Sequence, residues 1–100
     1  MQTYILMTTL TPGDLGNADA RRGKGKEWLE HVHRACPEVK WVAHYALLGR
    51  YDFMDIYEAP DDATAHKVSL ISRSEGAATA ESWPAMAWDQ HLQLLKDVED

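Results

Sequence analysis

Short runs of β-branched and apolar residues alternate along this chain with segments in which apolar residues recur every three or four positions. The first run, residues 3–10, predicts a strand that stops at Pro12-Gly13. The polar, glycine-containing segment 11–25 predicts a loop, with a helix starting near its end, at Ala18 or later. Pro37 ends that helix. Its apolar stripe consists of Trp28, Leu29, Val32, Ala35 and Cys36.

Two further strands and a second helix follow. Residues 39–48 and 51–59 are apolar and aromatic runs separated by Gly49-Arg50, which predicts a β-hairpin. Pro60-Asp61-Asp62 supplies a stop and an N-cap for a helix over residues 63–73.

The C-terminal part of the chain predicts one more strand and one more helix. Residues 77–83 are assigned to a strand from the order of elements, because alanine is a poor strand former. Pro84 is well placed to begin a helix that runs to Val98. The broad apolar face of this helix consists of Ala87, Trp88, His91, Leu92, Leu94, Leu95 and Val98. We expect its Trp88, Leu92 and Leu95 edge to dock against protein, with His91 buried.

The order β-α-β-β-α-β plus a terminal helix predicts a single α+β domain over residues 1–100. Such a split β-α-β repeat folds as a ferredoxin-like antiparallel sheet with both helices on one face. The other face is left bare. In a chain this rich in aromatic residues we expect the bare face to meet a second copy, which gives a homodimer or a higher oligomer.

The hairpin turn predicts which residues lie opposite one another. The expected pairs are Leu48 with Tyr51, Ala46 with Phe53, His44 with Asp55 and Val42 with Tyr57. Alternation then gives a mainly apolar face suited to packing on helices: Trp41, Ala43, Tyr45, Leu47, Met54 and Ile56. The other face is mixed and is expected to be the bare one: Val42, His44, Ala46, Phe53, Asp55 and Tyr57.

His44 and Asp55 are the best candidates for chemistry. Opposed side chains on neighbouring strands are close enough to hydrogen-bond. A carboxylate that holds a histidine is a recurring device for general-base chemistry and for orienting a metal or haem ligand. The alternative is a satisfied polar pair that fixes the register of an interface. Both interpretations remain open from the sequence.

Charge and composition exclude several classes of partner. Sixteen acidic residues against ten basic ones give a net charge of −6, which argues against nucleic acid or an anionic membrane as the main partner. The single Cys36 excludes an internal disulfide and a cysteine-based zinc cluster, and suits a reducing, cytoplasmic location. The N-terminal segment has the features of neither a signal peptide nor a membrane span. We expect no metal.

The other histidines and the basic run are weaker candidates. His31 and His33 lie on opposite flanks of a helix and cannot share one ion. Four of the ten basic residues fall within six positions, and could collect a phosphate or carboxylate ligand near a helix start, although a solvated loop is the alternative. These four are Arg21, Arg22, Lys24 and Lys26.

The hairpin residues 48–62 resemble the signature of the GYD-domain family, with Gly49, Tyr51 and Asp52 as its glycine, tyrosine and aspartate. The resemblance extends over most of residues 3–83. It implies the dimeric α/β-barrel superfamily, in which two ferredoxin-like sheets close face to face. Relatives by fold include cofactor-free monooxygenases, haem-degrading enzymes and ligand-sensing domains, so fold does not settle function. Asp52 is expected to cap the hairpin turn.

Three functions are therefore carried forward. The first is binding of a small molecule, with or without cofactor-free catalysis, in a pocket between the mixed face and the covering helices. The expected lining is Tyr4, His44, Phe53, Asp55, Tyr57, Glu81 and Trp83. The second is a non-catalytic assembly or regulatory module that uses the same aromatic residues as an interface. The third is haem binding through His44 or His91.

Overall fold

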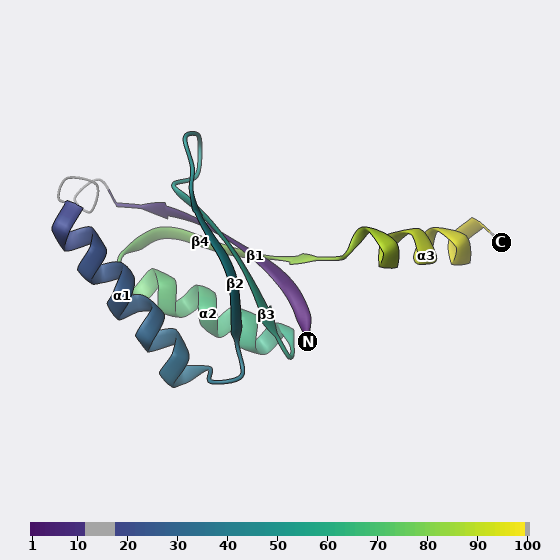
Figure 1. Ribbon diagram of the computed structural model, residues 1–100, viewed down its shortest axis with the longest axis horizontal. Helices are drawn as coiled ribbons and strands as arrows, with labels where there is room; N and C mark the ends of the chain where they lie inside the picture. Colours follow the sequence, from purple (N-terminus) through teal and green to yellow (C-terminus); the bar gives the residue numbers. More distant parts are fainter. Residues whose placement is uncertain (12–17, 100) are drawn as a thin grey trace.

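The computed structural model describes residues 1–11 and 18–99, without the side chains of residues 18–21 (Figure 1). The elements are β1 (Gln2–Leu10), α1 (Ala18–Ala35), β2 (Lys40–Ala46), β3 (Phe53–Ala59), α2 (Asp62–Ser74), β4 (Ala77–Ala85) and α3 (Trp88–Glu99). The strands form one sheet in the order β2-β3-β1-β4, with every neighbouring pair antiparallel. The predicted α+β, ferredoxin-like order of elements is confirmed. Among the described residues no helix is long and apolar enough to cross a membrane.

The structure corrects two predictions. The first helix begins at Ala18, the earliest start that the sequence predicts, so residues 18–25 of the expected loop are helical, and residues 12–17 lie outside the described part of the chain. Its glycines are tolerated because the second half of α1 anchors the helix in the core. Pro84 does not start a helix: it lies in β4, opposite Tyr4. β4 is an edge strand, where the missing N–H of a proline is harmless.

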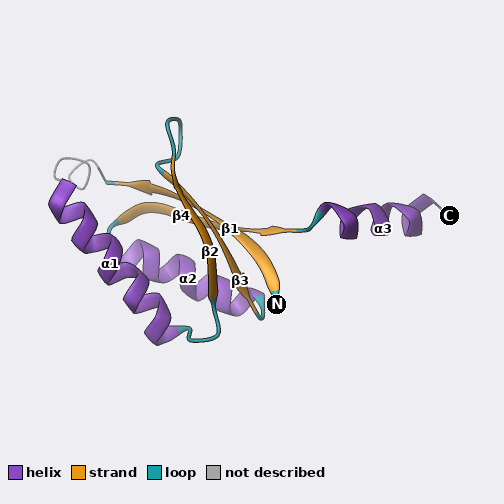
Figure 2. Ribbon diagram, viewed as in Figure 1, coloured by secondary structure: helices purple, strands orange, loops and turns teal. Residues whose placement is uncertain are grey.

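Both α1 and α2 cover the same face of the sheet (Figure 2). Between these helices and the sheet lies a row of stacked aromatic rings. The ring of Tyr57 stacks on Tyr4 at 5.5 Å on one side and on Trp41 at 5.1 Å on the other. Trp28 of α1 meets Trp41 edge-on at 5.1 Å. The helices add buried residues to this core, as does Cys36 directly after α1. The helical ones are Val32, Ala65, Val68 and Ile71.

The hairpin keeps the predicted register near its turn. Pairing of Ala46 with Phe53 and of His44 with Asp55 is confirmed, and a backbone hydrogen bond from Leu47 to Asp52 closes a four-residue loop. Further from the turn the prediction is wrong, because the register shifts between Trp41 and Ala43 and Trp41 takes the place of Val42 opposite Tyr57. This bulge turns the Trp41 ring to the side on which His44 lies.

The two faces of the sheet are exchanged relative to the prediction. Asp55 and Tyr57 are buried beneath the helices, with 1% and 0% of their surface exposed. The face expected to pack on helices is instead open, and carries Ala43, Tyr45, Met54 and Ile56. Alternation places residues on two faces but does not say which one the helices cover. Here the covered side of β3 is the one that carries Phe53, Asp55 and Tyr57.

The C-terminal helix α3 projects from the end of β4, away from the sheet and the other helices (Figure 1). None of its described residues is buried, and Trp88 is 67% exposed. The apolar edge of α3 does not dock within this chain. The expectation that His91 is buried is wrong: His91 is exposed, and its ring lies 5.3 Å from that of Trp88 in the same helix. Because of this projection the radius of gyration is 15.3 Å, against roughly 13 Å for a compact chain of this length.

Asp52 holds the hairpin to β1. Its carboxylate Oδ2 accepts a hydrogen bond from the Leu10 N–H at 2.7 Å, and its own N–H donates to the Thr8 carbonyl at 2.8 Å. The side chain therefore ties the turn to the neighbouring strand, which differs from the expected cap within the hairpin.

Replacing Asp52 should loosen this end of the sheet. Asp52→Ala removes a charged acceptor from a partly buried backbone N–H and should lower the free energy of unfolding by about 2 kcal/mol. Urea denaturation followed by circular dichroism measures the change. Asp97→Ala, on the polar face of α3, is the matched control and should leave stability almost unchanged. Equal effects of the two substitutions would contradict the role given to Asp52.

Candidate functional site

A pocket of about 610 Å³ lies between the first half of α1 and the covered face of the sheet. The strands supply its floor, and α1 and the end of α2 supply its walls. The lining residues are Thr8, Leu10, Arg22, Lys24, Gly25, Lys26, Trp28, Leu29, Trp41, His44, Phe53, Asp55, Ser72, Glu75 and Ala77. Its volume falls within the range of roughly 300–1,000 Å³ that is typical of small-molecule sites.

The pair His44 and Asp55 lies on the floor of this pocket. The Asp55 carboxylate is buried, and its Oδ1 accepts hydrogen bonds from His44 Nδ1 and from Trp41 Nε1, the latter at 3.1 Å. The side chain of His44 is 53% exposed and stacks on the Phe53 ring at 5.3 Å. Because Nδ1 is bonded to Asp55, Nε2 is the ring nitrogen left to meet a ligand.

The same pair shifts the titration of His44. The hydrogen bond to Asp55 raises the pKa of His44 above its usual value, and this effect outweighs the partial burial of the ring, which lowers that pKa. The imidazolium form is therefore favoured beside the carboxylate. A histidine held in this way can give or take a proton near neutral pH.

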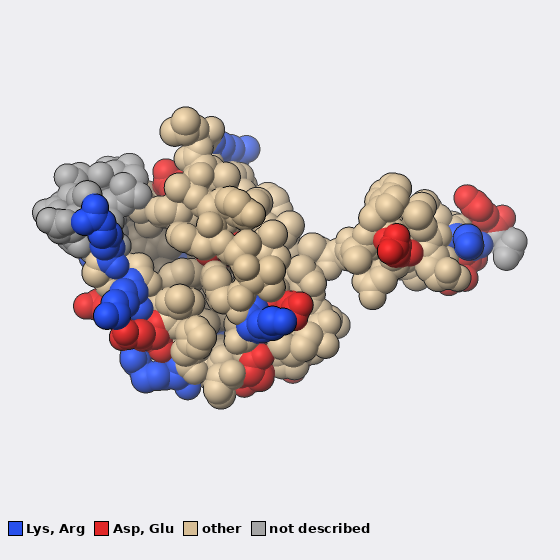
Figure 3. Space-filling view, viewed as in Figure 1, with Lys and Arg blue, Asp and Glu red and all other residues tan. Residues whose placement is uncertain are grey.

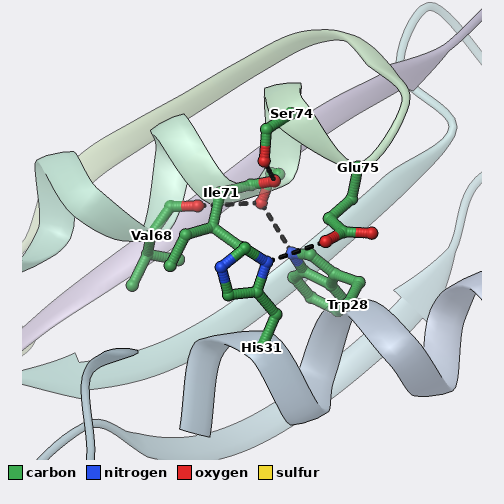
Figure 4. Close-up of polar contacts among 7 residues, drawn as sticks. Trp28, His31, Val68, Ile71, Ser74 and Glu75 are labelled. Atoms are coloured by element: carbon green, nitrogen blue, oxygen red, sulfur yellow. Dashed lines mark hydrogen bonds and ion pairs between the residues drawn. The ribbon is translucent and has the colours of Figure 1, made fainter. Parts of the chain in front are cut away.

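Contacts between α1 and α2 keep α1 above the sheet (Figure 4). Trp28 Nε1 donates to Ser72 Oγ at 2.8 Å, and His31 Nδ1 hydrogen-bonds to Glu75 Oε1 at 2.7 Å. Both contacts involve the second half of α1. Gly23 and Gly25, in its first half, have no neighbouring atom within 4 Å of where a Cβ would stand. The helix is thus anchored at one end and leaves room beneath the other.

The predicted lining residues fall into three places. His44, Phe53 and Asp55 lie together in the pocket. Tyr4 and Tyr57 share their sheet face but are buried in the aromatic core, where burial raises the pKa of each phenol to about 12. Tyr4 also reaches a second pocket of about 340 Å³ beside α2.

Glu81 and Trp83 lie on the open face of the sheet, away from the pocket. In β4 they are paired with Met7 and Ile5 of β1, and Trp83 Nε1 donates to Glu81 Oε1 at 3.2 Å. Tyr51, the tyrosine of the hairpin motif, meets the Trp83 ring edge-on at 5.9 Å. These residues form a cluster of their own on the open face.

Sequence reasoning missed the two tryptophans of the pocket. Trp28 was assigned only to the core stripe, and Trp41 to the opposite sheet face because nothing in the local pattern indicates the bulge at Val42. The sequence left the basic run as either an anion site or a solvated loop, and did not connect it with His44. Three of its members, Arg22, Lys24 and Lys26, line this pocket, and the side chain of Arg21 lies outside the description.

His31 and His33, the two histidines of α1, do not form a metal site with each other. His31 bonds to Glu75, and His33 is exposed on the surface of α1. In the described part of the chain, no group of three or more His, Cys, Asp or Glu side chains is placed to hold a metal ion.

The raised pKa of His44 predicts a pH-dependent contribution to stability. A histidine that binds its proton more tightly in the folded state stabilises the fold fully below its unfolded pKa, and this stabilisation is lost as the pH rises through the folded pKa. His44→Asn should therefore cost more stability at about pH 5.5 than at about pH 8.5. Urea midpoints at both pH values measure this, with exposed His33→Asn as control. A cost independent of pH would show that the hydrogen bond does not favour the protonated ring.

Comparison with known proteins gives relatives in sequence and in fold. A protein of Thermus thermophilus, named glutamine synthetase and cystathionine beta-lyase binding protein, is 35% identical over 96 residues, covering 96% of this chain and 100% of the relative. The crystal structure of FFRP-DM1 matches 86% of this chain and 100% of its own, with 22% identity and a TM-score of 0.51. A hypothetical protein from Pyrococcus horikoshii matches 91% of this chain and 96% of its own, with 22% identity and a TM-score of 0.50.

The two structures show similarity of fold alone, and agree with the four-stranded sheet described above. The family is shown by sequence. The model described as the GYD domain matches residues 4–95, which include the motif at Gly49, Tyr51 and Asp52 and extend into α3, beyond the stretch 3–83 on which the resemblance was based. This chain belongs to the GYD-domain family.

Proposed function

We propose that this protein binds a small organic molecule in the pocket between α1 and the sheet. The observation that carries the proposal is the placement of the His44–Asp55 pair on the floor of a cavity of about 610 Å³. Aromatic rings with a few convergent polar groups are the usual composition of such sites. A polar pair that served only to fix the register would need no cavity above it.

The chemistry available to the pocket is recognition and proton transfer. Asp55 fixes the imidazole ring of His44 through Nδ1, so Nε2 is the ring nitrogen available to a ligand. The histidine can donate a hydrogen bond to a ligand in its protonated form, or accept one in its neutral form. We therefore propose binding as the function. Catalysis by His44 and Asp55 would additionally require a ligand that exchanges a proton with His44.

Filling the pocket without disturbing the fold tests this proposal. Gly25 lines the cavity and Gly23 does not, and a Cβ at either position meets no atom within 4 Å. Both Gly→Leu substitutions should improve helix propensity by roughly 0.5–1 kcal/mol. Gly25→Leu should abolish retention of a small bound mass in native mass spectra of the purified protein, whereas Gly23→Leu should keep it.

The same spectra separate the alternatives. Equal retention of the bound mass by both variants would place the ligand elsewhere. If neither the unmodified protein nor Gly25→Leu carries a bound mass, the small-molecule function is contradicted. A Soret band in the absorption spectrum would identify haem as the bound molecule, and its loss in His44→Ala would distinguish His44 from His91 as the residue that holds it.

Protein binding is the second candidate function, and the name of the Thermus thermophilus relative favours it. That relative is named for binding two enzymes, and this chain covers its whole length at 35% identity. We propose by analogy that this chain also has protein partners. The exposed Tyr45 and Trp83 on the open face, at 52% and 41%, are the side chains most suited to such contacts.

We propose that the first protein partner is a second copy of this chain. Each chain carries two unpartnered apolar surfaces, the open sheet face and the stripe of α3. A helix of 12 residues is marginal in water when nothing packs on it, so α3 needs a covering surface from outside its own chain. In a two-fold symmetric dimer each chain can cover the exposed surfaces of the other, and the two open sheet faces meet as a dimeric α/β barrel.

A charge on the α3 stripe should weaken self-association. Trp88→Asp places a carboxylate on the apolar stripe, and should lower the thermal midpoint or reduce the mass measured by light scattering at micromolar concentration. Gln93→Asp adds the same charge on the opposite side of α3 and should change neither quantity. A monomer mass for the unmodified protein would overturn the proposed dimer.

A further inference from the structure

The pocket carries a concentration of positive charge on an acidic protein. Arg22, Lys24 and Lys26 all line it from the first half of α1. The chain as a whole has a net charge of −6 with ten basic residues, so three of the ten gather at one cavity. Figure 3 shows Lys and Arg atoms collected along α1, at the left of the view.

The two carboxylates of the pocket are both engaged by donors of the chain. Asp55 is buried and accepts from His44 and Trp41. Glu75 is bonded to His31 of α1. Among the lining residues that the structure describes, three cations stand against two carboxylates.

The walls beside these cations are aromatic. Trp28 and Trp41 meet edge-on at 5.1 Å, and Phe53 stacks on His44. All four rings line the cavity. Flat apolar surfaces of this kind favour a planar, unsaturated ligand body, because rings gain from stacked and edge-on contacts in addition to area burial.

We propose that the pocket selects aromatic oxyanions: a planar body bearing a carboxylate or phosphate group, with the body against the tryptophans and the anion toward the cations of α1. This inference rests on the proposed small-molecule function and names its ligand class. Cationic side chains at the mouth of a low-dielectric cavity attract anions and raise their local concentration. His44 adds a charged donor on the floor when it is protonated.

A solvated helix face is the competing account of the basic run. On a solvated face, these side chains would have no relation to a cavity. Here they line it together with Gly25, whose missing side chain leaves space open beside them. That juxtaposition depends on α1 being helical from Ala18 and anchored through Trp28, and it makes the basic run part of the binding surface.

Three matched probes test the ligand class: 2-naphthoate, 2-naphthyl phosphate and the neutral 2-naphthamide. Isothermal titration of the full chain should give at least one of the two anions an affinity about tenfold or more above that of the amide. The preferred anion distinguishes a carboxylate site from a phosphate site. Lys26→Glu should reduce binding of that anion by about tenfold while leaving the amide unchanged, since it reverses one charge at the pocket. Lys67→Glu, exposed on α2 outside the pocket, should affect none of the probes.

Equal binding of anions and amide, with no selective effect of Lys26→Glu, would overturn the ligand class and leave the pocket intact. Equal effects of Lys26→Glu and Lys67→Glu would also overturn it, because they would indicate attraction by the net charge alone. Absence of binding by all three probes would overturn it as well. The small-molecule function itself is decided separately, by the bound mass in Gly25→Leu and Gly23→Leu.

Discussion

The burial of the Asp55 carboxylate is the constraint on which the rest of the site depends. A carboxylate with 1% of its surface exposed must be hydrogen-bonded, because an unpartnered charge at that depth costs several kcal/mol. Both donors come from β2: His44 and Trp41. Regular alternation cannot present residues three apart on one face of a strand. The bulge at Val42 removes this conflict, so hairpin register, bulge and pocket floor form one connected arrangement.

The pocket exists because α1 is packed along only half of its length. Trp28 and Val32 hold the second half in the core, whereas Gly23 and Gly25 in the first half have no neighbouring atom within 4 Å of where a Cβ would stand. Packing by aromatic rings extends as far as Trp28 and then stops at the cavity. The first half of α1 thus places a glycine and three cations beside aromatic rings in one cavity. This arrangement supports the proposed binding of a small anion.

The open sheet face and α3 are the two exposed apolar surfaces of the chain. Two helices cover one face of the sheet, no described helix covers the other, and α3 projects beyond the sheet with its stripe exposed (Figure 1). Motif residue Tyr51 belongs to the cluster with Trp83 on that open face, and Asp52 ties the same turn to β1. The motif thus fixes the end of the sheet rather than lining the pocket. The proposed ligand pocket and the proposed assembly surface lie on opposite faces of one sheet, so the two proposed functions do not compete for the same residues.

The sequence by itself determined the order of elements, the antiparallel hairpin, the N-cap at Asp61 and the opposition of His44 and Asp55. These features follow from local rules: period, turn chemistry and fixed pairing from a short loop. Tertiary structure alone decided which sheet face the helices cover, because alternation is symmetric between two faces. It also decided the bulge that brings Trp41 to Asp55, and the helicity of residues 18–25, where packing of the later turns outweighs glycine propensity. The basic run lines the pocket only because α1 lies over the sheet. No local pattern in the sequence predicts where a helix packs relative to the sheet.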